Sequence, residues 1–326
     1  MTITWALQTN GDPLAASRRL LGLLWERAGL EGMILLGYQA GLLWAAPDWI
    51  NSPTQLEFAD PFIPLTPLNS SRLVVQMAGE RPDVKAAAVL RSCEARALYV
   101  VARRERLDMT NWLIIGVDCL ASFSSDEYAW RVQRAAAAER LTREALQFAR
   151  QGGIAAYRFR PACQMCISPL APPADLTLEV LGLPVRRVML VSARDQVLAA
   201  RLGLEDLVDG PAEGALLAQR QRLAIRLSDR RLRRREALLE ALPANLPLTP
   251  GDLFEHIAAC APCRKCLEVC PVYAGELEAR LSGKPFSADE AQIWLVSCVK
   301  CGMCEQACPR DLPLTAIHAR LSRELI

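Results

Sequence analysis

Eight of the twelve cysteines in this 326-residue sequence stand in two copies of one spacing near the C-terminal end. The two runs are Cys260, Cys263, Cys266 and Cys270, followed by Pro271, and Cys298, Cys301, Cys304 and Cys308, followed by Pro309. Each run has the spacing C-x2-C-x2-C-x3-C-P, which is typical of bacterial two-cluster ferredoxins. Four thiolates hold each [4Fe-4S] cluster in such proteins, so the spacing predicts two clusters and an electron-carrying function.

The fourth cysteine of each run binds the cluster of the other run in these ferredoxins. The first ligand set is therefore Cys260, Cys263, Cys266 and Cys308, and the second ligand set is Cys298, Cys301, Cys304 and Cys270. Structural zinc is the alternative, because a C-x2-C pair can hold that ion. Zinc needs only two such pairs and has no need of the further cysteines or the proline. A disulfide framework is weaker still, since a chain of this length does not need cross-links to stabilise its core.

Two of the other four cysteines follow predicted parallel strands. A strand over 85–90, a helix over 95–106 and a strand over 112–117 predict one βαβ unit. Cys93 and Cys119 then lie past the carboxyl ends of both strands, at the edge where open α/β sheets bind their ligands. Cys93 also lies near a helix N-terminus, which favours a thiolate.

The last two cysteines, Cys163 and Cys166, form a C-x2-C pair after a strand predicted over 154–159. If that strand joins the same sheet, four thiolates converge at one edge. We therefore predict a third [4Fe-4S] cluster on Cys93, Cys119, Cys163 and Cys166. A four-cysteine zinc site and unlinked core thiols remain the alternatives.

The chain is expected to form two domains. Residues 1–242 are predicted as a layered α/β domain with a mainly parallel sheet, 243–250 as a linker, and 251–326 as a helix-rich, two-cluster ferredoxin-like domain. Further expected elements are strands over 33–36 and 185–191, a helix over 126–150 with Ser125 as N-cap and Gly152 as its stop, a helix over 214–242, and C-terminal helices from Leu253, from about Asp289 and from Leu314. Prolines at 53, 61, 64 and 67 predict a loop over 52–67 that is neither a regular helix nor a central strand.

The helix predicted over 214–242 is strongly basic. Its arginines are Arg220, Arg222, Arg226, Arg230, Arg231, Arg233, Arg234 and Arg235. A solvated helix face explains such a run. That is the simpler explanation, and a docking stripe for an acidic partner subunit or a positive rim for an anionic cofactor are the functional alternatives.

The overall composition sets bounds on partners and location. Hydrophobic residues make up 52% of the chain, enough for a core, and a net charge of +2 gives no general field for nucleic acid. No run reaches the roughly 18 apolar residues of a membrane span, and the start lacks the pattern of a signal peptide. We expect a cytoplasmic protein without direct membrane insertion. The only histidines, His256 and His318, lie in predicted helices, and we expect no metal or catalytic role for them.

Three segments of the first domain resemble a known family. They are R-S-C-E-A-R-A-L and L-I-I-G-V-D-C, followed by A-C-Q-M-C with P-P-A-D-L-T after it. Across roughly residues 15 to 240 the chain resembles the beta subunits of coenzyme F420-reducing hydrogenases and related formate dehydrogenases. The family's cluster cysteines correspond to Cys93, Cys119, Cys163 and Cys166. The C-terminal module, with its long spacer between the runs, is similar to the small iron-sulfur subunit of heterodisulfide reductase.

The resemblance implies FAD beside the third cluster and hydride exchange with a deazaflavin or a similar carrier. No G-x-G-x-x-G fingerprint is present. Candidate flavin contacts are Asn69, Ser70 and Arg72, before a predicted helix, and Asp175. For the first three, a plain helix cap is the simpler explanation.

The expected function is that of an electron-transferring iron-sulfur flavoprotein subunit of an oxidoreductase. It would convert hydride from a soluble carrier, a deazaflavin or similar, into single electrons. Three clusters would relay these electrons to or from a partner such as formate dehydrogenase, hydrogenase or heterodisulfide reductase. Its soluble partner would be a hydride-carrying coenzyme or ferredoxin. Two alternatives stay open, a flavin-free electron carrier and a zinc-stabilised docking scaffold with a ferredoxin tail.

Overall fold

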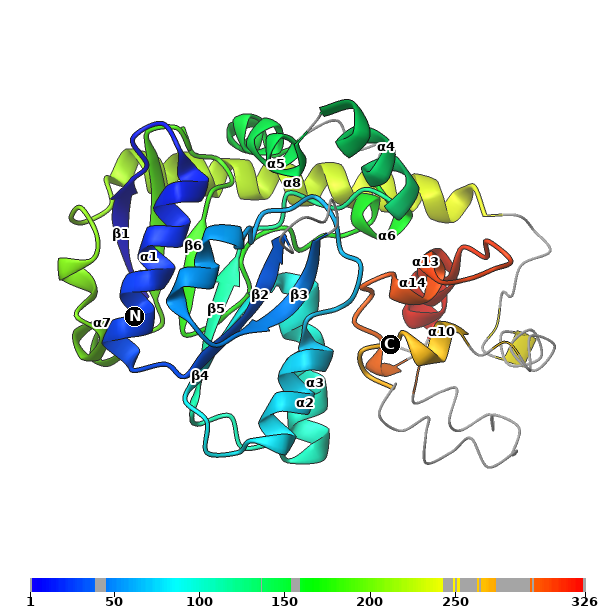
Figure 1. Ribbon diagram of the computed structural model, residues 1–326. Helices are drawn as coiled ribbons and strands as arrows, with labels where there is room; N and C mark the ends of the chain where they lie inside the picture. The colour runs from blue at the N-terminus through cyan, green and yellow to red at the C-terminus, as the bar shows by residue number, and fades with distance from the viewer. Residues whose placement is uncertain are drawn as a thin grey trace.

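The structure is a computed structural model that describes residues 2–38, 45–135, 137–153, 159–242, 249, 251–252, 263, 265–273, 294 and 296–324. An α/β domain with a seven-stranded sheet forms the larger part, and short helices form the C-terminal part (Figure 1). The strands are β1 (Ile3–Gln8), β2 (Gly32–Tyr38), β3 (Ala45–Ile50), β4 (Ala86–Arg91), β5 (Trp112–Val117), β6 (Leu176–Glu179) and β7 (Val188–Ala193). The helices are α1 (Pro13–Ala28), α2 (Ser71–Glu80), α3 (Ser92–Glu105), α4 (Ser125–Ala135), α5 (Ala138–Gln147), α6 (Pro161–Gln164), α7 (Gln196–Leu202), α8 (Gly214–Glu240), α10 (Lys265–Glu268), α13 (Met303–Gln306) and α14 (Leu314–Glu324).

The sheet has the order β1-β7-β6-β5-β4-β2-β3. Its central strands β2, β4, β5 and β6 are mutually parallel, and β7 and β3 pair antiparallel to β6 and β2. Because β1 pairs antiparallel to β7, it runs in the direction of the central strands. The predicted layered α/β fold with a mainly parallel sheet is thus confirmed, including the βαβ unit of β4, α3 and β5.

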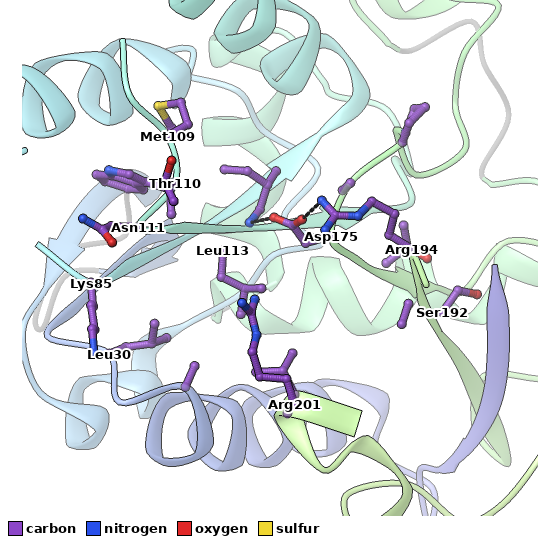
Figure 2. A pocket seen from close by; sticks show the side chains of 18 of the residues that line it. Leu30, Lys85, Met109, Thr110, Asn111, Leu113, Asp175, Ser192, Arg194 and Arg201 are labelled. Atoms are coloured by element: carbon purple, nitrogen blue, oxygen red, sulfur yellow. Dashed lines mark hydrogen bonds and ion pairs between the residues drawn. The ribbon is translucent and has the colours of Figure 1, made fainter. Parts of the chain in front are cut away.

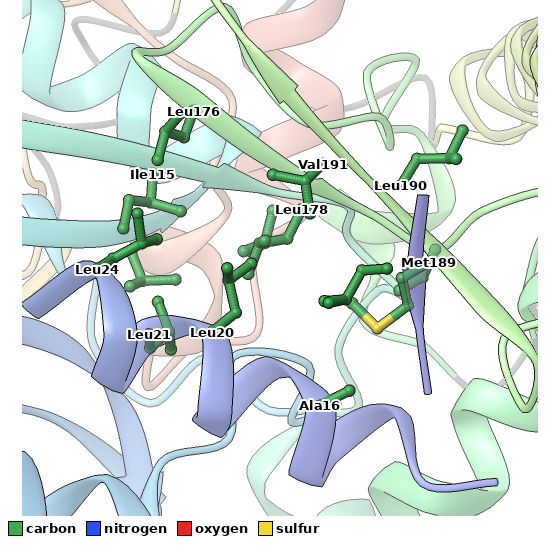
Figure 3. Close-up of a cluster of buried hydrophobic side chains, with 14 of the residues drawn as sticks. Ala16, Leu20, Leu21, Leu24, Ile115, Leu176, Leu178, Met189, Leu190 and Val191 are labelled. Atoms are coloured by element: carbon green, nitrogen blue, oxygen red, sulfur yellow. The ribbon is translucent and has the colours of Figure 1, made fainter. Parts of the chain in front are cut away.

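Helices cover both faces of this sheet. Along β4, Ala87 and Val89 pack into the core beneath α1, whereas Ala88 and Leu90 pack on the other side beneath α2 and α3. This alternation follows from the two-residue period of a strand. In Figure 3, Leu20, Leu21 and Leu24 of α1 meet side chains of β5, β6 and β7 in the larger core. The central strands are therefore buried on both sides, as parallel strands commonly are.

A truncation in this core should destabilise the domain strongly. Leu21 is fully buried on α1, so Leu21→Ala leaves a cavity and should lower the free energy of unfolding by about 2–5 kcal/mol. Anaerobic denaturant unfolding, followed by tryptophan fluorescence, measures the change. Val197→Ala is the control, because Val197 is 78% exposed, and an equal loss in both variants would contradict the packing argument.

The helix predicted over 126–150 is wrong as one element, because it forms α4 and α5 and ends in a short 3-10 turn. Tyr128 and Val132 are buried on α4, and Leu141 and Ala145 on α5. At 100° per residue, an unbroken helix would turn Leu141 about 180° away from Val132. The break brings both apolar stripes against the domain. The predicted stop at Gly152 is confirmed by its φ of 90°.

Other boundaries also differ from the predictions. Ser124 takes the capping position before α4, where we expected Ser125, because its Oγ accepts a hydrogen bond from the Glu127 N–H at 3.4 Å. The proline-rich loop contains a 3-10 helix, Pro53–Phe58, whose first proline needs no hydrogen-bond partner. The predicted strand 154–159 lies outside the described residues except for Phe159, which makes an isolated bridge to Phe123.

Much of the predicted linker and of the segment between the two cysteine runs also lies outside the described residues, including the predicted helices from Leu253 and from about Asp289. The C-terminal helix predicted from Leu314 is present as α14. Within the part of the chain that the structure describes, no helix has both the length and the apolarity to cross a membrane.

Candidate functional site

The four dispersed cysteines of the first domain line one cavity. Cys93 lies in the first turn of α3, Cys119 follows β5, Cys163 belongs to α6, and Cys166 comes just after it. Cys301 of the second C-terminal run lines the same cavity. The structure therefore brings the predicted third ligand set together and places it against the C-terminal module.

Backbone hydrogen bonds hold these cysteines in place. The Cys119 N–H donates to the Pro169 carbonyl at 2.8 Å, which ties the end of β5 to the segment after Cys166. The Cys163 N–H donates to the Arg160 carbonyl at 2.9 Å in the turn that begins α6. The ring of Phe159 packs on Phe123 with centroids 5.1 Å apart. These contacts help to hold the C-x2-C pair at this edge.

Three buried arginines lie near these cysteines, and one of them, Arg160, lines the cavity. Arg91, Arg160 and Arg231 are 2%, 6% and 6% exposed. Arg160 Nε donates to Cys163 Sγ at 3.3 Å, and Arg231 Nη1 donates to the Cys163 carbonyl at 2.5 Å. Arg91 donates to the Leu65 carbonyl and to Thr66 Oγ1. None of the three forms an ion pair with a carboxylate in the described structure, although a buried charge is costly without an opposite charge nearby.

One buried carboxylate lies beside this group. Glu94 accepts hydrogen bonds from the Arg91 N–H at 2.8 Å and from Ser70 Oγ at 2.8 Å. A single carboxylate against three guanidinium groups leaves a local excess of positive charge. Four thiolates that hold an anionic centre would offset this excess, so the donor set and its surroundings fit an iron-sulfur cluster.

The cysteines of this cavity differ in acidity. Burial raises the pKa of Cys93 well above its usual value, and the charge of Glu94 adds to the rise. Burial and the charge of Glu94 therefore oppose the effect of the helix N-terminus, which we expected to favour a Cys93 thiolate. Burial also raises the pKa of Cys163, but the charge and hydrogen bond of Arg160 outweigh it and hold that pKa below its usual value.

The second ligand set lines a cavity of its own. Cys270, Cys298, Cys301 and Cys304 lie around it, together with Trp294 and His318. His318 is fully buried, lies edge-on to Trp294 with ring centroids 4.4 Å apart, and has a pKa that burial lowers to about 4. Its imidazole is therefore neutral at pH 7.

The first ligand set is described in part, because Cys260 lies outside the described residues. Burial raises the pKa of Cys266 to about 12, and the charges of Cys308 and Cys263 add to the rise. Cys266 and Cys308 of the first set and Cys304 of the second set pack against one apolar cluster, which contains Leu314 and Ile317 of α14. The first set is therefore next to the second.

The junction between the two parts of the protein runs along α3. After Cys93, this helix packs Ala97 and Val101 into a cluster with Leu267 and Val272 of the C-terminal module. Arg96 donates to the Val299 carbonyl at 3.1 Å. Lys300 and Cys301 line both cavities, so the third and second ligand sets are neighbours.

The predicted flavin contacts Asn69, Ser70 and Arg72 are engaged within the chain. Asn69 Oδ1 accepts hydrogen bonds from Ser71 at the start of α2, and Ser70 donates to Glu94. Arg72 Nη1 donates to the Glu268 carbonyl at 2.9 Å. These contacts are those of a helix cap and a module junction. They do not form a flavin site together with Asp175.

Asp175 lines a different and much larger cavity of about 970 Å³ (Figure 2). This cavity lies at the amino ends of β4 and β5, beside Lys85 and Trp112, and thus at the edge of the sheet opposite Cys93 and Cys119. Asp175 accepts a hydrogen bond from the Ile114 N–H at 2.9 Å and pairs with Arg194 at 2.6 Å. The positive charge of Arg194 therefore already offsets the negative charge of the Asp175 carboxylate.

The basic helix, α8, is more than a solvated face. Arg222, Arg226 and Arg233 are exposed, as that explanation expects. Arg220 instead forms a buried ion pair with Asp118 and Glu179, and Arg231 reaches the cysteine cavity. Sequence reasoning missed the roles of Arg91, Arg160 and Arg231, because no spacing distinguishes these arginines from exposed ones.

Comparisons with known proteins identify the C-terminal module. Residues 259–312 match the family model of the 4Fe-4S dicluster domain. The acetyl-CoA decarbonylase/synthase complex subunit alpha 1 of Methanosarcina mazei is 26% identical over 125 residues, which are 38% of this chain and 15% of that protein. NADH-quinone oxidoreductase subunit I of Pelobacter propionicus is 38% identical over 56 residues, or 16% of this chain and 30% of that one. This chain thus spans less than a third of either relative.

One solved structure is similar in outline. A chain of the F420-reducing [NiFe] hydrogenase complex from Methanosarcina barkeri aligns with a TM-score of 0.48 and 13% identity, over 73% of this chain and 91% of that chain. The prediction of two [4Fe-4S] clusters in the C-terminal module is confirmed by the family match. This part of the chain is a 4Fe-4S dicluster domain, an electron-transfer module.

Proposed function

We propose that this chain is an electron-transfer subunit of a multi-subunit oxidoreductase and carries a third [4Fe-4S] cluster on Cys93, Cys119, Cys163 and Cys166. The observation that carries the proposal is the cavity that these cysteines line together with the buried Arg160 and with Cys301. A third site so placed can exchange electrons with the dicluster domain over a short path.

Such clusters supply one-electron reduction and oxidation. The residues of this chain hold the sites, exclude water and set their electrostatics. Arg91, Arg160 and Arg231 favour added negative charge at the third site. The neutral, buried His318 and Trp294 line the second site together with Lys300, so each site has its own means of setting a potential.

The adjacency of the sets gives the relay an order. The third set borders the second through Cys301, and the second borders the first through Cys304 and Cys266. Electrons would therefore pass between the α/β domain and a partner subunit through the second set and then the first. The subunit names of the two relatives support a place in a larger complex.

The hydride side of this function rests on the resemblance alone. A formate dehydrogenase, hydrogenase or heterodisulfide reductase partner, a deazaflavin carrier and FAD are what that resemblance implies. The four residues predicted to contact the flavin do not fit one site. FAD therefore stays a prediction.

Metal and flavin analysis of anaerobically purified protein tests the proposal. We expect about twelve iron and about twelve acid-labile sulfides per chain, because three cubes contribute about four of each. About eight iron without zinc would contradict the third cluster. About eight iron with one zinc would support the docking scaffold instead. FAD in the same preparation would support the flavoprotein, and its absence the flavin-free carrier.

A further inference from the structure

Arg160 lies at the contact between the third and second ligand sets. Its backbone begins the turn that carries Cys163, and its guanidinium reaches across to α13 of the dicluster domain. Nη1 donates to Gln306 Oε1 at 3.0 Å and lies 3.6 Å from Met303 Sδ. Gln306 in turn donates to Ser125 Oγ at 3.1 Å. Hydrogen bonds from both parts of the protein thus fix the side chain in one place.

The backbones also approach closely at this point. Gly302 precedes α13 and follows Cys301, and a Cβ built on it would lie 2.2 Å from the Cβ of Ala162. Ala162 is the neighbour of Cys163 in α6. The turns that carry Cys163 and Cys301 are therefore packed directly against each other, with Arg160 beside them.

The charge of Arg160 has no carboxylate to offset it in the described structure. Its hydrogen-bond partners are sulfur atoms and a neutral amide. Cys163 and Cys93 of the third set and Cys301 of the second set interact electrostatically with it. A guanidinium is always protonated, so one fixed positive charge faces thiolates of two sets at once.

We propose that Arg160 is a positioning residue shared by two clusters, which raises the reduction potential of both and holds the third site against the second. The inference rests on the proposed function and adds to it the residue that couples the sites. When an electron crosses, one site is oxidised and the other is reduced by that same electron. No bond to Arg160 forms or breaks, and no proton moves. A nearby positive charge favours the reduced, more negative state of each site.

Redox titrations followed by electron paramagnetic resonance test this inference in the full-length chain. In Arg160→Met, which keeps the bulk and removes the charge, the midpoint potentials of the second and third sites should both fall. In Arg160→Lys, which keeps the charge, the fall should be smaller at both sites. Arg103→Met is the matched control, because Arg103 is an exposed residue of α3 and its loss should leave both potentials unchanged.

Iron content decides which comparison is used. If Arg160→Met keeps its iron, unchanged potentials at both sites overturn the inference, and a fall at only one site overturns the sharing. If Arg160→Met loses iron from the third site, the double variant Cys93→Ser/Arg160→Met is compared with the single variant Cys93→Ser. The midpoint potential of the second site must then be lower in the double variant than in Cys93→Ser. Absence of third-site iron from the unmodified chain would instead defeat the proposed function itself.

Discussion

Replacing Cys93 by Ser should remove about four iron from the anaerobically purified protein and abolish the signal of one cluster, because a [4Fe-4S] cube needs its four thiolates. The two C-terminal clusters should persist, since Cys93 belongs to neither of their ligand sets. Iron and sulfide analysis, with electron paramagnetic resonance of the reduced protein, measures both effects. The loss is expected to be a whole cluster, so about eight of twelve iron should remain.

The matched control changes another side chain of the same cavity. Ser168 lines it as well but carries no sulfur, so Ser168→Ala should keep its full iron content. Unchanged iron in Cys93→Ser would contradict the third cluster, and equal loss in both variants would point to a collapse of the cavity. Thermal unfolding of the two variants separates such a collapse from loss of one ligand.

The fold was predictable where one chemical pattern dominates a segment. The apolar runs of β4 and β5 are separated by an amphipathic helix of suitable length, a pattern that predicts a βαβ unit. The crossover of such a unit is almost always right-handed. That unit placed Cys93 and Cys119 at one edge. The sequence analysis did not predict the edge strand β1. Its few residues pair with β7, which lies near the other end of the domain in the sequence. Such long-range pairing has no local signal.

The cysteines of the candidate site could be found from the sequence, whereas the residues around them could not. Cysteine spacing predicts the dicluster module directly, and the family match confirms it. The C-x2-C pair of Cys163 and Cys166 lies at the expected edge, and the strand predicted before it lies outside the described residues except for Phe159. Turns, aromatic packing and a hydrogen bond from Arg231 contribute to its position. These contacts join residues far apart in sequence.

The second large effect is expected at Gly302, where the dicluster domain meets α6. The residue has a φ of +73°, a left-handed conformation in which a side chain costs about 1–2 kcal/mol. Its missing Cβ matters more, because an added one would lie 2.2 Å from the Ala162 Cβ. Gly302→Ala must therefore separate the turns that carry Cys301 and Cys163. The Arg160 contacts with Met303 and Gln306 should lengthen with them.

Gly29→Ala separates the effect of backbone strain from that of the clash. Gly29 has a similar φ of +60° but has no atom within 4 Å of an added Cβ. Both variants should lose stability through strain, and Gly302→Ala should lose more. Only Gly302→Ala should slow electron transfer between the third and second sites, which rapid reduction followed by freeze-quench electron paramagnetic resonance measures. Equal rates in both variants would mean that electrons do not cross at this contact, because the wider gap between the turns would then lie off their path.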